Sequence, residues 1–106
     1  MESSLYKNFV TSRGIKYHYY YSAAVSAKPV VLFVHGFPCT SADWRKQATF
    51  FKEKGYGLVI PDLLGYGGTD KPADTAAYQM SKMSTDLIEI LENEKVEKVI
   101  AVGHDW

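Results

Sequence analysis

Three short apolar runs without alternation constrain the fold of this chain more than any other feature. They span residues 30–34, 58–60 and 99–102. A strand that is buried on both faces forms a continuous apolar run, and such strands are typical of parallel sheets covered by helices. Helical patterns separate the three runs. The order strand, helix, strand, helix, strand predicts an α/β fold with a mostly parallel sheet and right-handed crossovers.

A β-hairpin is predicted ahead of the first apolar run. Residues 9–11 and 15–21 are rich in β-forming residues and flank the short loop Ser12-Arg13-Gly14. The second of these segments alternates, with Ile15, Tyr17, Tyr19 and Tyr21 on one face and Lys16, His18 and Tyr20 on the other. This pattern is typical of an amphipathic strand, which we expect at the edge of the sheet with His18 on a solvated outer face.

Two helices are predicted between the apolar runs. Thr40 or Ser41 can cap the first helix and Gly55 can end it, and apolar residues recur at helical spacing at Trp44, Ala48 and Phe51. The second helix begins around Ser81. Its apolar stripe comprises Met83, Leu87, Ile90 and Leu91. Its charged residues are expected to face outward, namely Lys82, Asp86, Glu89 and Lys95.

Length and composition exclude several classes of protein. A chain of 106 residues is at most one domain, and its 12 basic and 12 acidic residues leave no net charge. No basic block favours a nucleic acid partner. The single cysteine, Cys39, cannot form an internal disulfide, and neither a signal peptide nor a membrane-spanning run is present. We therefore expect a cytoplasmic protein.

Unusual stretches follow all three apolar runs. They are residues 35–38, 62–72 and 103–106. The carboxyl ends of parallel strands meet at one edge of a sheet, where α/β proteins bind their ligands. The sequence therefore predicts that all three stretches lie at one functional edge.

Asp105 is the candidate nucleophile. A nucleophile elbow is a tight, strained turn that needs small neighbours, and Gly103 provides one. A carboxylate can attack carbon and form an ester, which divides one difficult displacement into two steps. From the residues alone, an aspartate in an ordinary turn after a strand is an equally good interpretation.

Residues 35–38 are the candidate oxyanion-hole segment. Gly36 lets the backbone approach a ligand, and the N–H of Phe37 could then point at a developing negative charge. The residue after the nucleophile, Trp106, could supply a second N–H. The alternative is a plain strand-to-helix turn stiffened by Pro38. His35 by itself favours a structural, hydrogen-bonded role over that of a catalytic base.

The glycine-rich loop from Asp62 to Pro72 is a poor match to nucleotide-binding motifs. Its glycine spacing does not fit a dinucleotide fingerprint, and it lacks the Gly-Lys-Ser/Thr of a phosphate-binding loop. A loop that shapes the backbone is the better interpretation, with Asp62 holding it through side-chain-to-backbone hydrogen bonds. No metal site is expected, because the spacing of the candidate ligands does not suit one: His18, His35, His104 and Cys39.

Together these motifs resemble the α/β-hydrolase fold and, within it, the epoxide hydrolase family. The motifs are Val-His-Gly-Phe-Pro at 34–38, Pro-Asp-Leu-Leu-Gly-Tyr-Gly-Gly-Thr-Asp-Lys-Pro at 61–72 and Val-Gly-His-Asp-Trp at 102–106. The resemblance implies that Asp105 attacks an oxirane carbon, and that the N–H groups of Phe37 and Trp106 stabilise the ester's hydrolysis to a diol. It implies that His35, Gly36, Pro38 and Gly103 shape the loops. It implies a small-molecule epoxide substrate and no cofactor or metal.

Two related enzyme groups and one non-enzymatic role remain as alternatives. Haloalkane dehalogenases resemble the Asp-Trp pair but usually carry Asn where this chain has Phe37. Fluoroacetate dehalogenases resemble the His-Gly-Phe-Pro segment but tend to carry Arg where this chain has Trp106. Both departures favour an epoxide hydrolase. The third alternative is a short, non-catalytic protein derived from the same fold.

The resemblance also predicts what the chain lacks. Residues 1–106 are expected to form part of an α/β-hydrolase core domain that ends just after the nucleophile. The family's catalytic histidine, its acid partner and its cap domain lie in later sequence. By this interpretation the chain alone is an inactive fragment, because an ester intermediate without a base does not turn over.

Overall fold

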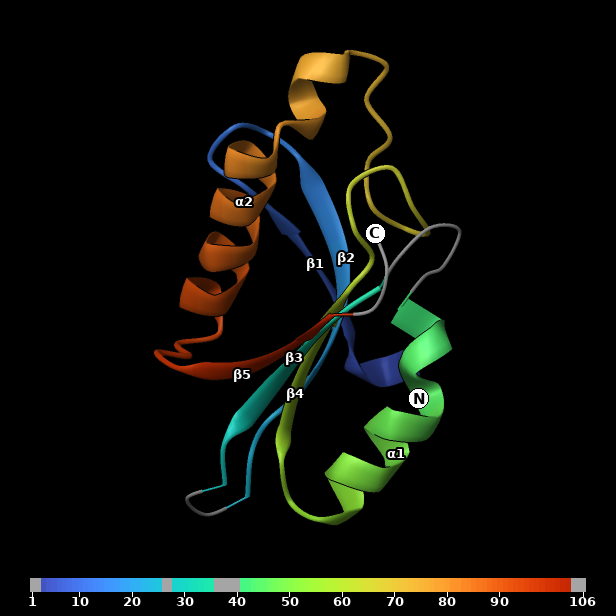
Figure 1. Ribbon diagram of the computed structural model, residues 1–106, viewed down its shortest axis with the longest axis vertical. Helices are drawn as coiled ribbons and strands as arrows, with labels where there is room; N and C mark the ends of the chain where they lie inside the picture. The colour runs from blue at the N-terminus through green and yellow to red at the C-terminus, as the bar shows by residue number, and fades with distance from the viewer. Residues whose placement is uncertain (1–2, 26–27, 36–40, 104–106) are drawn as a thin grey trace.

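A five-stranded sheet forms the centre of the computed structural model, which describes residues 3–25, 28–35 and 41–103. Its strands are β1 (Tyr6–Val10), β2 (Lys16–Ser22), β3 (Val30–Val34), β4 (Gly57–Pro61) and β5 (Val99–Gly103). The helices are α1 (Arg45–Glu53) and α2 (Met80–Asn93), with short 3-10 helices η1 (Ser3–Leu5), η2 (Ser41–Trp44) and η3 (Thr75–Tyr78). The strand order is β1-β2-β4-β3-β5 (Figure 1).

The sheet is mixed, with a parallel core. β3 pairs in parallel with β4 and with β5, while β2 pairs antiparallel with β1 and with β4. The predicted hairpin followed by alternating strands and helices is therefore confirmed. The predicted position of the second hairpin strand is wrong, because β2 lies between β1 and β4. Tyr20, on its supposedly outer face, is fully buried beneath the α1 layer.

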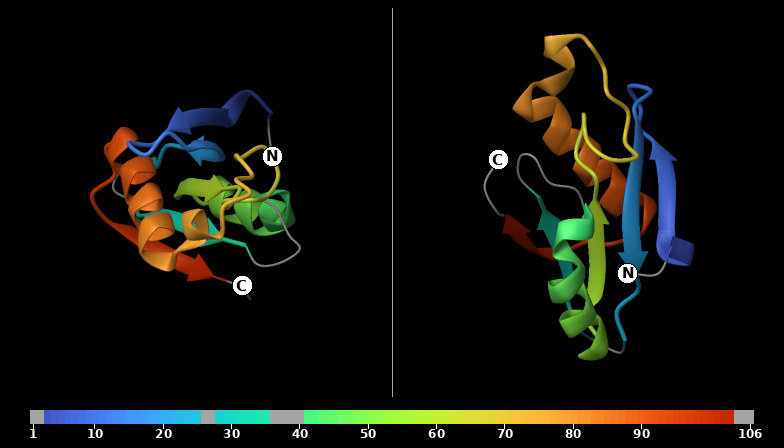
Figure 2. Two further views of the ribbon diagram at one scale, coloured as in Figure 1. Left: turned by 90° about the horizontal axis from the view of Figure 1, so that it is seen from above. Right: turned by 90° about the vertical axis from the view of Figure 1, so that its right-hand side faces the viewer.

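Each face of the sheet is covered by one helix (Figure 2). On one face, Tyr17, Tyr19 and Val59 pack with the apolar stripe of α2. On the other, Tyr20, Phe33 and Ile60 pack with α1. Every residue of β4 is buried, as expected for a strand covered on both faces.

Helix α1 starts later than predicted and without a side-chain cap. Ser41 opens the 3-10 helix η2 instead, and its hydroxyl lies 3.0 Å from the hydroxyl of Tyr6. The residue that caps α1 is Trp44, whose side chain makes no capping hydrogen bond. The predicted stop is confirmed, since Gly55 has a φ of +88° directly after the helix.

The charged face of α2 differs from the prediction. The apolar stripe packs on the sheet as expected, but Asp86 is only 1% exposed. Arg13 Nε donates to both oxygens of its carboxylate at 3.0 and 3.1 Å, and the Tyr17 hydroxyl donates to one at 2.7 Å. The pKa of Tyr17 is raised above its usual range, mainly by burial and secondly by the hydrogen bond to Asp86. Asp86 therefore faces the hairpin because an arginine and a tyrosine bind it there.

Two further carboxylates join α2 to the hairpin. Glu89 accepts two hydrogen bonds from Ser12, both at 2.7 Å, so it too is bound where solvent exposure was predicted. Glu94, just after α2, accepts from Lys7 and from the Tyr19 hydroxyl. The hairpin is thus connected to α2 and to the residue that follows it by three acidic groups, Asp86, Glu89 and Glu94.

Strand β5 has a neighbour on one side only among the described residues. It pairs with β3, and Ile100 in its middle is 50% exposed. The prediction that residues 99–102 form a strand buried on both faces is therefore wrong for the described residues, because nothing among them covers the second edge of β5. No helix of the described ranges is long and apolar enough to cross a membrane.

Replacing Asp86 by asparagine is expected to lower the free energy of unfolding by about 1–3 kcal/mol, because buried, charge-assisted hydrogen bonds to Arg13 and Tyr17 are lost. Urea unfolding measures the loss. The matched control is Glu92→Gln on the exposed side of the same helix, which should change stability by less than about 0.5 kcal/mol. Equal stability of the two variants would contradict the structural role of Asp86.

Candidate active site

The carboxyl ends of the three parallel strands lie at one edge of the sheet. β3 ends at Val34, β4 at Pro61 and β5 at Gly103, and Val34 is paired with Gly103 in the parallel register (Figure 1). The segments after β3 and β5 therefore start from neighbouring strands. Gly103 is exposed, and a Cβ atom added to it would meet nothing within 4 Å.

Five of the predicted site residues lie outside the described residues. They are Gly36, Phe37, Pro38, Asp105 and Trp106. Their roles as nucleophile, oxyanion-hole donors and loop-shaping residues stay predictions. The structure does describe the residues that flank them, namely His35, Ser41 and Gly103, and the loop that follows β4. We call these residues the frame of the site.

His35 links the end of β3 to the loop after β4. Its side chain is 2% exposed, and its Nε2 accepts a hydrogen bond of 2.9 Å from the backbone N–H of Leu63. The ring also packs edge-on against Tyr66, with centroids 5.1 Å apart. An acceptor at Nε2 requires that this nitrogen carry no proton. The imidazole thus acts as a fixed connection between two loops.

Asp62 is the central polar residue of this edge. It is 4% exposed, and its carboxylate accepts from the N–H of Gly68 at 3.0 Å and from the N–H of Ser41 at 2.8 Å. The predicted side-chain-to-backbone bonds within the loop are confirmed. The bond to Ser41 was not foreseen, because no sequence signal connects two residues that approach only through the sheet.

The glycines of the loop make room for this carboxylate. Gly67 has a φ of +51°, and a Cβ atom there would lie 2.4 Å from Asp62 Oδ2. Thr69 closes the turn, since its buried hydroxyl donates to the carbonyl of Asp62 at 2.6 Å and accepts from the N–H of His18 at 2.9 Å. The loop is therefore wrapped around its own aspartate.

His18 is part of this frame, and the prediction that it is solvated is wrong. Its ring is half-buried and stacks on Tyr6 with centroids 4.6 Å apart. A Cβ atom added to Gly68 would meet this ring at 2.8 Å. The hairpin and the loop approach so closely that the supposedly outer face of β2 is covered at His18 and Tyr20, while Lys16 stays exposed.

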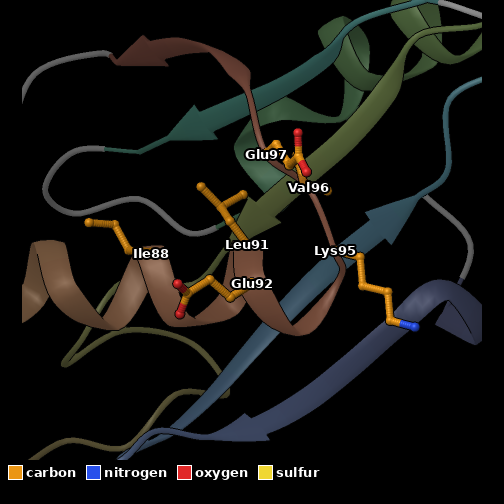
Figure 3. Close-up of a pocket in the computed structure, with 6 residues that line it drawn as sticks. All are labelled: Ile88, Leu91, Glu92, Lys95, Val96 and Glu97. Carbon is orange, nitrogen blue, oxygen red and sulfur yellow. The ribbon is translucent and has the colours of Figure 1, made fainter.

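Two cavities that are lined by described residues lie away from this edge. One, of about 500 Å³, is lined by the end of α2 and the segment leading into β5: Ile88, Leu91, Glu92, Lys95, Val96 and Glu97 (Figure 3). Another, of about 220 Å³, lies beside Arg13, Asp86 and Glu89. Arg13 and Asp86 form an ion pair, and Glu89 binds Ser12. Within the described ranges, no three His, Cys, Asp or Glu side chains gather into a possible metal site.

Comparison with known proteins assigns the chain to a family. A model of the alpha/beta hydrolase fold matches residues 29–106. The chain belongs to the alpha/beta hydrolase fold family. The match begins one residue before β3, so the matched region includes the parallel strands and leaves out the hairpin.

Epoxide hydrolases are prominent among the similar members of the family. Epoxide hydrolase 3 of Siraitia grosvenorii is 42% identical over 97 residues, which cover 92% of this chain and 30% of that protein. An epoxide hydrolase of Caballeronia sordidicola is 39% identical, covering 92% and 29%. The chain thus spans about 30% of the length of these relatives.

Solved structures of epoxide hydrolases share the same arrangement of elements. A mutant of a Vigna radiata epoxide hydrolase superposes with a TM-score of 0.86 at 37% identity, covering 95% of this chain and 30% of that one. Epoxide hydrolase A of Mycobacterium thermoresistibile gives a TM-score of 0.83 at 32% identity, covering 95% and 31%. The predicted membership in the α/β-hydrolase fold, with a likeness to epoxide hydrolases, is confirmed.

Gly67→Ala is expected to destabilise the chain much more than Gly14→Ala. Both glycines have positive φ, which costs an alanine about 1–2 kcal/mol. A Cβ at Gly14 meets nothing within 4 Å, whereas at Gly67 it collides with Asp62, for a further 1–3 kcal/mol or so. Urea unfolding of the two variants isolates the collision, and equal losses would show that the carboxylate does not fill the turn.

Proposed function

We propose that the protein containing this sequence is an epoxide hydrolase with Asp105 as its nucleophile. The observation that carries the proposal is the register that pairs Val34 with Gly103. It starts the segment of Phe37 and the segment of Asp105 from adjacent strands at the ligand-binding edge. The names of the similar proteins supply the substrate class.

In the first half of the proposed reaction, Asp105 opens the epoxide. A carboxylate oxygen attacks a ring carbon, the bond from that carbon to the ring oxygen breaks, and the product is a hydroxyalkyl ester. The ring oxygen takes up a proton as it leaves. We propose that the acid that supplies this proton comes from the additional length over which the relatives extend.

In the second half, water hydrolyses the ester. A base removes a proton from water, the resulting hydroxide adds to the ester carbonyl, and negative charge develops on the carbonyl oxygen. The N–H groups of Phe37 and Trp106 would bind this oxygen. Collapse of the tetrahedral intermediate breaks the bond from the acyl carbon to the alcohol oxygen, which takes the proton held by the base and leaves as the diol. Loss of the new carboxyl proton to water restores the carboxylate of Asp105.

The chemistry divides unequally along the sequence. These residues would supply the nucleophile and the oxyanion-hole donors, while the base and the acid would come from the rest of the length over which the relatives extend. We therefore propose that turnover requires that additional sequence. This chain by itself would not release diol, because no base is assigned to hydrolyse the ester.

Asp105→Ala is expected to abolish diol formation from an epoxide such as styrene oxide, because the attacking carboxylate is gone. The protein tested is the product of the longest open reading frame that contains these residues, and diol is measured by chromatography. Glu97→Ala, which removes an exposed carboxylate on another part of the chain, serves as the control and should keep the activity. Retained diol formation in Asp105→Ala would refute the nucleophile.

A single turnover in heavy-oxygen water tests the ester directly. With enzyme in excess, the new diol oxygen should come from Asp105 and the label should appear in its carboxylate. Label in the diol at the first turnover would instead indicate direct attack by water.

Halide release from a bromoalkane, without diol from epoxides, would favour the dehalogenase alternative.

A further inference from the structure

Both ends of the segment that precedes α1 are bound to one point of the fold. His35 and Ser41 are each 2% exposed, and the residues between them include the candidate oxyanion donor. His35 accepts from the N–H of Leu63, and Ser41 donates its N–H to Asp62. Two consecutive residues at the end of β4 thus hold the start and the finish of this segment.

We propose that Asp62 is a positioning residue for ester hydrolysis, acting on the proposed oxyanion-hole segment through its hydrogen bond to the backbone N–H of Ser41. This inference rests on the proposed function. Asp62 would touch neither substrate nor ester. It would act through the segment that begins at His35 and ends at Ser41.

Asp62 is itself held on every side. Its backbone N–H donates to the carbonyl of His18 at 2.8 Å, and its own carbonyl accepts from the Thr69 hydroxyl at 2.6 Å. The second carboxylate oxygen accepts from Gly68 at 3.0 Å. A group that is fixed by β2 and by its own loop can transmit their rigidity to the segment that contains Ser41.

The geometry requires two acceptors on one side chain. Oδ1 faces the N–H of Ser41 and Oδ2 faces the N–H of Gly68. Asparagine has the same shape but only one acceptor oxygen, so its NH₂ group would face an N–H donor on one side. At 4% exposure, little water can take the place of the lost acceptor.

The position of Ser41 is supported by a second contact. Its hydroxyl lies 3.0 Å from that of Tyr6, whose pKa is raised by burial and also by the nearby charge of Asp62. Asp62 therefore binds the N–H of Ser41 and also lies close to Tyr6, whose hydroxyl contacts the Ser41 hydroxyl. The contact between the hydroxyls offers a way to separate the role of the Ser41 side chain from that of its N–H.

Oxyanion donors act on only one of the two half-reactions. Charge develops on the ester carbonyl oxygen during hydrolysis, whereas ring opening places charge on the ring oxygen. A fault in the position of these donors should therefore slow ester hydrolysis and leave ester formation unchanged. General destabilisation of the fold would affect both steps or neither.

The test is single-turnover kinetics of Asp62→Asn in the product of the longest open reading frame, with styrene oxide as the probe. Intact mass spectrometry follows formation and loss of the ester separately. We expect hydrolysis to slow about tenfold or more, less than the ~10²–10³-fold cost of deleting a donor outright, with formation within about twofold of the parent. The ester should accumulate on Asp105.

Asp86→Asn is the matched control, since it changes another buried aspartate that binds the hairpin and not this edge. It should lower stability without changing the ratio of the two rates. The positioning role would be overturned if Asp62→Asn left the ratio of ester hydrolysis to ester formation unchanged. It would also be overturned if Asp86→Asn changed this ratio by the same amount. Absence of any ester in the parent protein would instead refute the proposed function, and the positioning role with it.

A pair of variants at Ser41 tests the same inference without touching Asp62. Ser41→Pro removes the N–H, and the first residue of the 3-10 helix is a position where proline suits the helical turn. Ser41→Ala removes only the hydroxyl. Slower ester hydrolysis in the proline variant alone would support the role of the N–H bond. The same slowing in both, or in neither, would overturn it.

Discussion

The pairing of β3 with a parallel strand on each side is the constraint on which this structure depends. It brings the ends of three strands to one edge, although the residues that follow them are separated by tens of positions in the sequence. The register needs no polar side chains, because the backbone ladder and the apolar burial of β3 and β4 specify it. Chemistry can therefore be placed at the strand ends without weakening the sheet.

The polar groups of the structure divide into two systems with different tasks. At the edge, Asp62, His35 and Thr69 bind backbone groups of neighbouring loops, so they give definite positions to segments without regular hydrogen bonding. On the α2 side, Asp86 and Glu89 bind the hairpin. The first system arranges the candidate site, and the second attaches the hairpin to the helix.

Much of the fold was predictable because burial leaves a periodic record in sequence. The apolar runs of β3 and β4 and the stripe of α2 are such records, whereas the apolar run of β5 predicted a buried strand that is largely exposed among the described residues. The identity of a strand's neighbours leaves no such record in the sequence. The strand β2 was therefore predicted at the edge of the sheet, where β1 lies instead. Asp86 was predicted to be exposed because helical spacing places it on the charged face of α2. Helical spacing does not reveal that Arg13 of the hairpin binds that face.

The candidate site was predictable in part. The loop-holding bonds of Asp62 follow from its place before a glycine-rich turn, and the structure contains them. The bond from Ser41 joins residues 21 positions apart and depends on how β3 and β4 align, which no local pattern encodes. Asp105, Phe37 and Trp106 rest on motif order and on the likeness to epoxide hydrolases.

The contacts between the hairpin and α2 have a consequence for the order of folding during synthesis. They join residues 69 to 87 positions apart, from Tyr17 with Asp86 to Lys7 with Glu94. The hairpin is made first, yet its arginine, tyrosines and lysine meet their partners only after α2 has left the ribosome. Contacts of such long sequence separation form slowly, because loop closure precedes any gain from them. The hairpin strands are thus fully secured only after α2 has been synthesised.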